Sequence, residues 1–341
     1  MRVIDGADRA QRRWSVLGYP IGVIYKYFDD QGNYLASIIT YYAFIAIFPL
    51  LLLGSSILGF LLQDNPELQQ DLLDSALAQF PIIGDQLGRP EGIKGSTAAI
   101  VIGSLVALYG ALGLGQALQN ALNVAWSVPR NSRPNPILLR LKSLFLLVTA
   151  GVAVLSISVL STLAANTEVL GESVSSYRWP ITLSTVIINT TVLTLLFRIG
   201  AARSPSIWTG AIPGAVTASL LWIGLQMLGT LYVTSVLTET SAMNQTFGLV
   251  LGLIGLLWLT AAAGMFGIEV NVVLERRLWP RALLTPFTDR VILTDADQRA
   301  YTSYAKAQRH KGFENVEVTF TDSTKLRVVA QEPDDGADHA S

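Results

Sequence analysis

The sequence predicts an all-α membrane protein: a six-span transmembrane helix bundle, N-in/C-in, with a small polar cytoplasmic C-terminal appendage. Three observations predict this fold class. Of the 341 residues, 51% are hydrophobic and only 14% are charged, whereas charged residues make up about a quarter of ordinary soluble domains. Six long stretches contain no Asp, Glu, Lys or Arg. Lys and Arg are concentrated in alternate connecting segments.

Each charge-free stretch is long enough to cross a bilayer. An ionised side chain at the bilayer centre costs at least about 2.5–3.5 kcal/mol, and a spanning helix needs about 20 residues. The stretches are 31–63, 95–129, 143–167, 179–197, 204–238 and 240–268. Helices are expected near Leu35–Leu62, Thr97–Leu122, Leu144–Ala164, Ile181–Phe197, Ile207–Val236 and Phe247–Leu274.

The distribution of basic residues predicts the orientation. Segments on the same side as the N-terminus contain 21 Lys and Arg residues, and the opposite side contains three, namely Arg89, Lys94 and Arg178. Short cytoplasmic loops of membrane proteins carry the excess of Lys and Arg. We therefore expect both termini in the cytoplasm, which agrees with an even number of spans.

By composition the chain divides into three regions. Residues 1–34 form a cytoplasmic and interfacial segment, residues 35–280 the six-helix transmembrane domain, and residues 281–341 a cytoplasmic tail. In the first region, the aromatic-rich stretch 14–28 predicts an interfacial helix that is interrupted at Pro20.

In the tail, two elements are expected before a disordered end. Residues 295–309 predict a surface helix, and the alternation of apolar and polar residues at 316–320 predicts the first strand of a hairpin. The acidic stretch 332–341 contains Pro and Gly and is expected to be disordered.

Four acidic residues share one face of an amphipathic helix that we expect in the first outer loop. They are Asp64, Glu67, Asp71 and Asp74. A divalent cation or a cationic ligand could bind such a face, but the glycine turn of calcium-binding loops is missing. A solvated acidic surface is the favoured interpretation, and no metal site is predicted.

Composition also excludes several classes of function. The chain has no cysteine, and its two histidines, His310 and His339, lie in the tail. Thiolate chemistry and His-ligated metal sites in the apolar body are therefore excluded. The net charge of −1 provides no basic excess for nucleic acid. We predict no catalytic residues, no cofactor and no nucleic-acid partner.

Four amides lie on one stripe of the second predicted helix, at helical spacing. They are Gln116, Gln119, Asn120 and Asn123. Amides in hydrocarbon need hydrogen-bond partners, so they could line a polar cavity that opens toward the cytoplasm. Alternatively they hold neighbouring helices together, which is the favoured interpretation.

Glu269 is the one carboxylate inside a predicted span. An intramembrane acid is a candidate functional residue whose partner has to be identified. Arg198, Asn120 and Asn123 are candidate partners. The same residues could instead form a fixed polar link between helices, and both interpretations stay open.

Small residues and prolines indicate how the helices pack and bend. Two pairs at four-residue spacing, Gly210 with Gly214 and Gly248 with Gly252, allow close helix approach. Pro49 and Pro213 are expected to kink the first and fifth spans.

Several of these stretches together resemble a known family. The stretches are Phe28-Asp29-Asp30, Tyr41-Tyr42-Ala43-Phe44, Ile47-Phe48-Pro49-Leu50-Leu51, Gly210-Ala211-Ile212-Pro213-Gly214-Ala215 with Trp222 and Tyr232, and Phe247-Gly248 with Trp258 and Gly267-Ile268-Glu269-Val270-Asn271. Over roughly residues 25–280 the chain is similar to the YihY/BrkB integral membrane proteins. Phe247 stands where Tyr is common in the family, and Ile268 where Ala is usual. The resemblance implies a six-span protein of the bacterial inner membrane, and the residues do not support an old ribonuclease label of that family.

Three functions are compared. In the first, a transporter or lipid-handling protein of the cell envelope, the amide stripe, Glu269, Asn271, Tyr41 and Tyr42 contact an anionic or amphiphilic substrate, and membrane lipids are partners. In the second, an envelope scaffold, the glycine faces and the tail bind other proteins. The third, a membrane-bound hydrolase, requires carboxylates that converge on a metal, and no such spacing is present. A homo-oligomer is compatible with all three.

Overall fold

The computed structural model of the chain describes residues 8, 11, 15–61, 63, 70–71, 97–165, 178–202, 208–232, 242–285, 288 and 291–321. Within these ranges every regular element is a helix, and no strand occurs there. The predicted all-α class is therefore confirmed for the described part of the chain.

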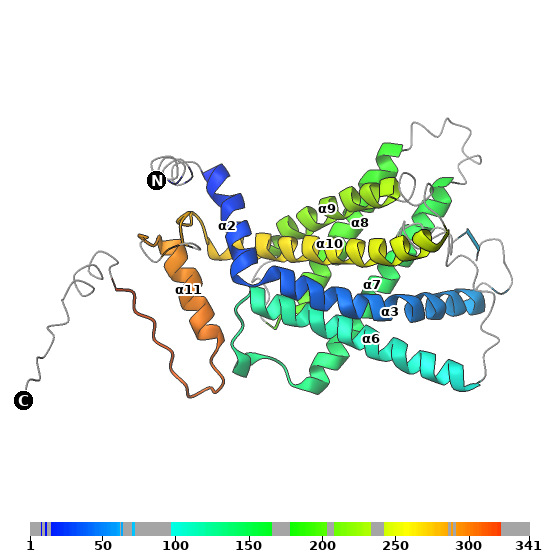
Figure 1. Ribbon diagram of the computed structural model, residues 1–341, viewed down its shortest axis with the longest axis horizontal. Helices are drawn as coiled ribbons and strands as arrows, with labels where there is room; N and C mark the ends of the chain where they lie inside the picture. Colours follow the sequence, from blue (N-terminus) through cyan, green and yellow to red (C-terminus); the bar gives the residue numbers. More distant parts are fainter. Residues whose placement is uncertain are drawn as a thin grey trace, which may run out of the picture.

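Six long helices form the body of the protein (Figure 1). They are α3 (Gly32–Leu61), α6 (Thr97–Ala125), α7 (Pro136–Ala165), α8 (Arg178–Gly200), α9 (Ile212–Tyr232) and α10 (Ala242–Arg276). Each coincides with a predicted helix, although the ends differ. Among the described residues, four helical stretches are long and apolar enough to cross a membrane: 136–156, 183–200, 212–232 and 247–276. The count of six spans stays a prediction.

Helix α7 begins earlier than expected because its first turn has its own start signals. The Asn135 side chain accepts a hydrogen bond from the backbone N–H of Leu138 at 2.8 Å, and Pro136 is the first helical residue. Asn as a cap and Pro at the first position are both typical of helix N-termini. Arg140 and Lys142, which end the charge-free stretch, therefore lie within the helix.

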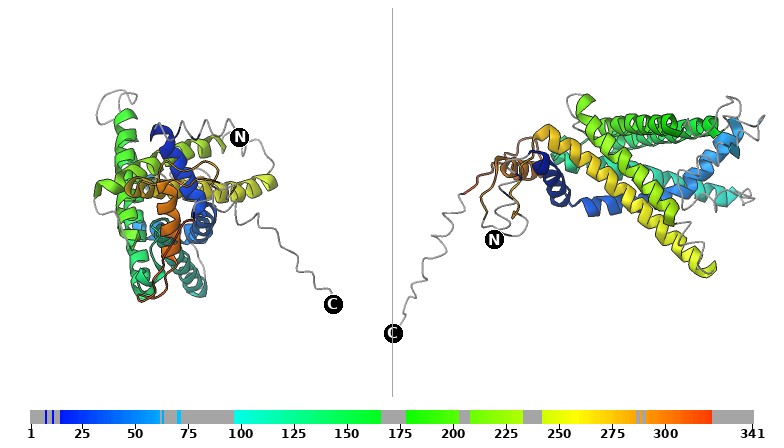
Figure 2. Two further views of the ribbon diagram at one scale, coloured as in Figure 1. Left: turned by 90° about the vertical axis from the view of Figure 1, so that its left-hand side faces the viewer. Right: turned by 90° about the horizontal axis from the view of Figure 1, so that it is seen from above.

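The six long helices pack in a ring that follows the order of the chain. Each one contacts the next, from α3 through α6, α7, α8 and α9 to α10, and α10 returns to pack against α3. Figure 2 shows this arrangement from two further directions. Two smaller contacts cross the ring, from α6 to α8 and from α6 to α10.

Two shorter helices lie at one end of this ring, which we call the capped end. Helix α2 (Ser15–Asp29) packs against α10 and α3, and α11 (Asp295–Ala307) lies beyond it (Figure 1). Helix α2 runs through Pro20 without a break, so the predicted interruption is wrong. Pro20 removes one backbone hydrogen bond near the start of the helix, and packing on α10 compensates for that loss.

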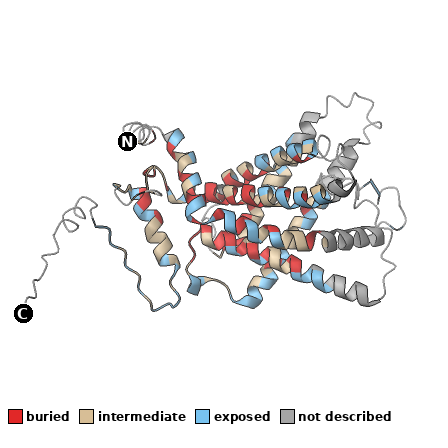
Figure 3. Cartoon of the chain, in the orientation of Figure 1, coloured by how far each residue is buried: buried red, intermediate tan, exposed pale blue. Residues whose placement is uncertain are grey.

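The largest buried cluster of the described residues lies at the capped end (Figure 3). It combines side chains of α2, α3, α6, α8, α9 and α10, among them Tyr27, Leu35, Leu122, Phe197, Ala218 and Met265. Several of its members are alanines, including Ala121, Ala125 and Ala215. Small side chains allow helices in a membrane to approach closely, so these alanines permit close packing at the capped end.

Helices α9 and α10 approach most closely at two glycines. A Cβ added to Gly214 would lie 1.9 Å from the carbonyl oxygen of Gly267, so no larger residue fits there without a backbone shift. Gly214 thus has the packing role that its spacing predicted. Gly210 lies just before α9, in the short 3-10 helix η4 (Trp208–Ala211). Gly248 lies in α10, where its carbonyl accepts a hydrogen bond from the Tyr232 hydroxyl at 3.0 Å. Gly252 is half-buried in the same helix.

The two prolines occupy different positions in their helices. Pro213 is the second residue of α9, which directly follows η4, whereas one continuous helix was expected over Ile207–Val236. Because the first helical N–H groups have no partner within the helix, Pro213 starts a helix here and does not bend the middle of one. Pro49 lies inside α3, which is helical on both sides of it.

The tail forms one of its two predicted elements within the described residues. The predicted surface helix is present as α11. Residues 316–320 form no strand, so the predicted first arm of the hairpin is wrong. Of the predicted acidic face, Asp71 is exposed and helical, and Asp64, Glu67 and Asp74 lie outside the described residues, as does the stretch 332–341.

Candidate functional site

A lysine and two carboxylic acids meet at the capped end, between α2 and α10. Lys26 lies in the last turn of α2, Asp30 follows that helix, and Glu269 lies in α10. The Lys26 ammonium donates a hydrogen bond to the Asp30 carboxylate and lies 3.6 Å from Oε2 of Glu269. The side chains of Lys26, Asp30 and Glu269 are only 1%, 2% and 0% exposed. We call these three residues the Lys26 cluster.

The end of α2 places Lys26 and Asp30 side by side. The two residues are four apart, the spacing at which helical side chains meet, and the backbone N–H of Asp30 still bonds the Lys26 carbonyl at 3.0 Å. Gln31 then turns the chain into α3 with a φ of 56°. The Tyr27 ring stacks on Phe266 of α10 with centroids 4.2 Å apart, which holds α2 against α10 one turn before Glu269.

Helix α11 closes the Lys26 cluster from the other side. The Lys26 ammonium lies 5.0 Å from the centre of the Tyr304 ring, within the range of a cation–π contact. Burial, followed by the nearby carboxylates of Asp30 and Asp29, raises the pKa of Tyr304. Its hydroxyl therefore stays protonated, and it lies 3.4 Å from a carboxylate oxygen of Asp29.

The two acids of the Lys26 cluster have unequal hydrogen bonding. Asp30 accepts from Lys26, whereas neither carboxylate oxygen of Glu269 accepts a hydrogen bond from any described group. Burial raises the pKa of Asp30, and the ammonium of Lys26 opposes that shift. One buried ammonium thus serves two carboxyl groups.

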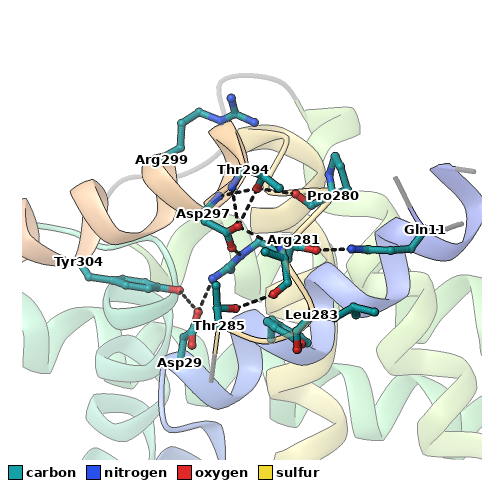
Figure 4. Close-up of polar contacts among 12 residues, drawn as sticks. Gln11, Asp29, Pro280, Arg281, Leu283, Thr285, Thr294, Asp297, Arg299 and Tyr304 are labelled. Atoms are coloured by element: carbon teal, nitrogen blue, oxygen red, sulfur yellow. Dashed lines mark hydrogen bonds and ion pairs between the residues drawn. The ribbon is translucent and has the colours of Figure 1, made fainter. Parts of the chain in front are cut away.

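A second cluster lies next to the first and joins α2, the segment after α10, and α11 (Figure 4). Arg281 donates from Nη2 to Asp29 at 2.9 Å and from Nε to Asp297. We call these three residues the Arg281 cluster. Burial alone would lower the pKa of Arg281, but the carboxylates of Asp29 and Asp297 outweigh it and raise that pKa. The guanidinium also lies over the rings of Tyr25 and Tyr301.

The carboxylate of Asp297 in this second cluster accepts several further hydrogen bonds. It accepts from the backbone N–H of Ala282 at 3.0 Å and from both the N–H and the hydroxyl of Thr294, at 2.9 and 2.8 Å. Thr294 in turn caps the start of α11 by accepting from the Asp297 N–H. This reciprocal pair is a capping box, so Arg281 is tied directly to the first turn of α11.

Comparison with known proteins identifies the family. The family model described as virulence factor BrkB matches residues 23–288. The chain belongs to the BrkB family. The predicted YihY/BrkB resemblance is thereby confirmed, and the family region contains all three residues of the Lys26 cluster, whereas Tyr304 and Asp297 of α11 lie beyond it.

One curated relative of this BrkB-family chain is the inner membrane protein YhjD of Escherichia coli (strain K12). The two are 27% identical over 124 residues, which cover 35% of this chain and 36% of that protein. The match therefore spans about a third of the relative's length. No solved structure matches the chain. The family and this relative agree with the apolar helices in making the chain a membrane protein.

In this BrkB-family chain the four predicted amides of α6 differ in burial. Gln119 is buried and donates to the Ser143 hydroxyl of α7 at 2.8 Å. Asn123 is buried and accepts from the backbone N–H of Ala202, after α8, at 2.9 Å. These two amides link helices, whereas Gln116 and Asn120 are exposed. Asn120 accepts from Arg133 at 3.1 Å.

The other predicted site residues lie in three places. Asn271 is buried and lies two residues after Glu269 in α10. Its side-chain amide accepts a hydrogen bond from the Gly214 N–H at 2.7 Å and donates one to the Ala211 carbonyl at 3.1 Å. It therefore holds the start of α9 on α10. Tyr41 and Tyr42 are an edge-to-face pair on α3, with Tyr41 exposed. Arg198 is half-buried in the last turn of α8.

Sequence reasoning did not find Lys26 and Asp30. Lys26 counted only as one of the basic residues on the inner side. Asp30 bordered a charge-free stretch and belonged to the family-like stretch Phe28-Asp29-Asp30, but neither observation gave it a role in a site. A local signal was present, because Lys26 and Asp30 are four residues apart in a segment that is otherwise apolar and aromatic. That spacing predicts a charge pair on one face of a helix, and the acid in the last span needs a cation.

Proposed function

We propose that this chain is a transporter or lipid-handling protein of the bacterial inner membrane that moves an anionic or amphiphilic substrate. The observation that carries the proposal is the Lys26 cluster, an almost fully buried set of one base and two acids. It lies where a long apolar helix, α10, meets the shorter helix α2.

The cluster favours transport over a purely structural role for a physical reason. Ionisable groups inside membrane proteins are costly and typically mark pathways for ions or substrates. A structural link is expected to satisfy its buried charges with hydrogen bonds, and both oxygens of Glu269 lack one among the described residues. The ring of six helices supports the same proposal, because membrane transporters commonly bind substrates between helices.

The proposal includes six spans with both termini in the cytoplasm, so that the capped end faces the cytoplasm. The predicted excess of Lys and Arg on that side supports this orientation. The chain has no cysteine, so single cysteines can be introduced directly and labelled in intact cells with a membrane-impermeant maleimide. Gln63→Cys, at the outer end of α3, should be labelled, and Ser132→Cys, between α6 and α7, should react only after the cells are lysed.

Gln63 and Ser132 are both exposed on the folded chain, so a difference in labelling reports the side of the membrane on which each lies. Labelling of both cysteines from outside the cell, or of Ser132→Cys alone, would refute the proposed orientation.

The transport activity is tested with purified protein in liposomes that contain a fluorescent phosphatidylglycerol. We expect wild-type protein to accelerate the exchange of this lipid between leaflets, and Glu269→Gln to lose most of that acceleration. Glu275→Gln is the matched control, because Glu275 is an exposed glutamate on the same helix.

Two results would contradict the proposal. Exchange no faster than in protein-free liposomes would favour the alternative, an envelope scaffold without a substrate. Equal exchange by wild type, Glu269→Gln and Glu275→Gln would remove the Lys26 cluster from the transport mechanism.

A further inference from the structure

The charges around the Lys26 cluster do not balance. Helix α2 contributes the ammonium of Lys26 and the phenol of Tyr27, the turn after it contributes Asp30, α10 contributes Glu269, and α11 contributes Tyr304. With both acids ionised, one positive charge would face two negative charges.

Arg281, a second buried cation among the described residues of the capped end, is already engaged. It bridges Asp29 and Asp297, and Asp29 also faces the Tyr304 hydroxyl. Two carboxylates therefore compete for its charge as well, and Arg281 cannot compensate the second acid of the Lys26 cluster.

Among the described residues, the geometry shows which carboxyl group has no hydrogen-bond donor to balance a negative charge. Lys26 donates its hydrogen bond to Asp30, and its 3.6 Å separation from Glu269 exceeds hydrogen-bond length. Glu269 is fully buried and accepts no hydrogen bond from the described residues. The carboxyl groups of Asp30 and Glu269 nevertheless approach the same ammonium, Asp30 through its hydrogen bond and Oε2 of Glu269 at 3.6 Å. Two ionised carboxylates beside one ammonium repel each other, whereas a carboxylic acid and a carboxylate attract each other.

We propose that Asp30 and Glu269 share one proton, and that this pair is the proton-binding site of the protein. The proton forms the hydrogen bond that the two carboxyl groups otherwise lack. The cluster then holds one ammonium, one carboxylate and one carboxylic acid, with no net charge. The proton comes from water and returns to water, so no bond other than O–H forms or breaks.

This site implies a coupling between proton exchange and movement of the capped end. The Tyr304 ring of α11 lies over Lys26, and the stacked rings of Tyr27 and Phe266 join α2 to α10. The side chains of the cluster are almost completely removed from solvent. A proton therefore leaves only when α2 or α11 moves away from α10. The claim that the proton is the coupling ion rests on the proposed transport function. The claim that Asp30 and Glu269 share a proton is independent of that function.

The shared proton is tested by infrared spectroscopy of the full chain in lipid nanodiscs at neutral pH. A protonated carboxyl group has a C=O stretching band that shifts in D2O, and we expect such a band in the wild type. Asp30→Asn and Glu269→Gln should each abolish it, because the remaining acid then pairs with Lys26 as a carboxylate. Glu275→Gln should retain it.

Use of two acid variants keeps the test decisive if one of them fails to fold. Absence of the band in the wild type, or its persistence in the folded acid variants, would overturn the inference.

A second measurement separates this inference from the proposed function. Lipid exchange in liposomes is measured with and without a pH gradient, and we expect the gradient to change the wild-type rate and leave the residual rate of Glu269→Gln unchanged. A shared-proton band without any lipid exchange would refute the transport function and leave the proton site. Lipid exchange that ignores the gradient, in protein without the band, would refute the proton site and leave the transport function.

Discussion

The Lys26 cluster and the Arg281 cluster have the same charge ratio, one base to two acids, but they differ in hydrogen bonding. In the Arg281 cluster, Asp297 accepts from Arg281, a backbone N–H and a capping threonine, and Asp29 remains partly exposed to water, with 22% of its side chain accessible. In the Lys26 cluster, both acids are buried, and Glu269 has no hydrogen-bond donor among the described residues.

This difference separates a structural link from a candidate functional site. Nη1 of Arg281 has no hydrogen-bond partner among the described residues, but the acids of its cluster do. Buried acids that are hydrogen-bonded in this way hold elements in one arrangement, and removal of their cation is strongly destabilising. A buried acid that lacks a donor can change its charge by binding a proton, because protonation also removes its desolvation penalty. The Arg281 cluster fixes α11 on the bundle, and the Lys26 cluster can change its protonation state.

The largest effect is expected from Arg281→Met. The substitution keeps most of the apolar stem and leaves Asp297 buried without its cation, so the folded state should lose about 3–5 kcal/mol. Thermal unfolding in detergent should show a clearly lower Tm. Arg140→Met, at an exposed position of α7, is the control and should change little. A Tm close to the wild-type value for Arg281→Met would mean that α11 is not held by this cluster.

The six helices were predictable from the sequence because hydrocarbon excludes charge along a whole span. That signal is local and continuous, so each helix was placed within a few residues, apart from the start of α7. There the criterion failed because Arg140 and Lys142 belong to a helix that continues beyond its apolar part. The strand expected at 316–320 rested on alternation alone, and alternation cannot show whether a partner strand exists.

The candidate site was only half predictable. Glu269 stood out because a charge in a span is rare, but its partner comes from a segment at the other end of the chain, and no local pattern shows which distant residues meet. The amides show the same limit. Gln119 and Asn123 belonged to a predicted stripe of four amides, and only the packing of α7 and α8 shows that these two link helices.

A smaller and pH-dependent effect is expected from Lys26→Met. The ammonium of Lys26 counteracts the rise that burial causes in the pKa of Asp30, so the pKa of Asp30 should rise further in the variant. The folded state then binds more protons than the unfolded state, in which an Asp has a pKa of about 3.9. Stability therefore falls as the pH rises from that value through the higher folded pKa, by up to about 1.4 kcal/mol per pH unit for each additional bound proton.

Measurement of Tm from acidic to alkaline buffer checks this sign. Lys26→Met should be close to the wild type in acid and fall increasingly below it as the pH rises. Lys306→Met, which removes an exposed lysine of α11, should follow the wild type throughout. If the Tm of Lys26→Met were lower than that of the wild type by the same amount at every pH, Lys26 would not control the protonation of the cluster.

The smallest effect is expected from Tyr304→Phe, which tests the contact between the two clusters. The ring that covers Lys26 is retained, and only the hydroxyl that faces Asp29 at 3.4 Å is removed. Since that hydrogen bond is long and Asp29 keeps Arg281, the loss should be at most about 0.5–1.5 kcal/mol, with the infrared band unchanged. Tyr304→Ala also removes the aromatic cover and should therefore lower the band as well as Tm. If Tyr304→Phe abolished the band, the hydroxyl would belong to the proton site, and the two clusters would act as one unit.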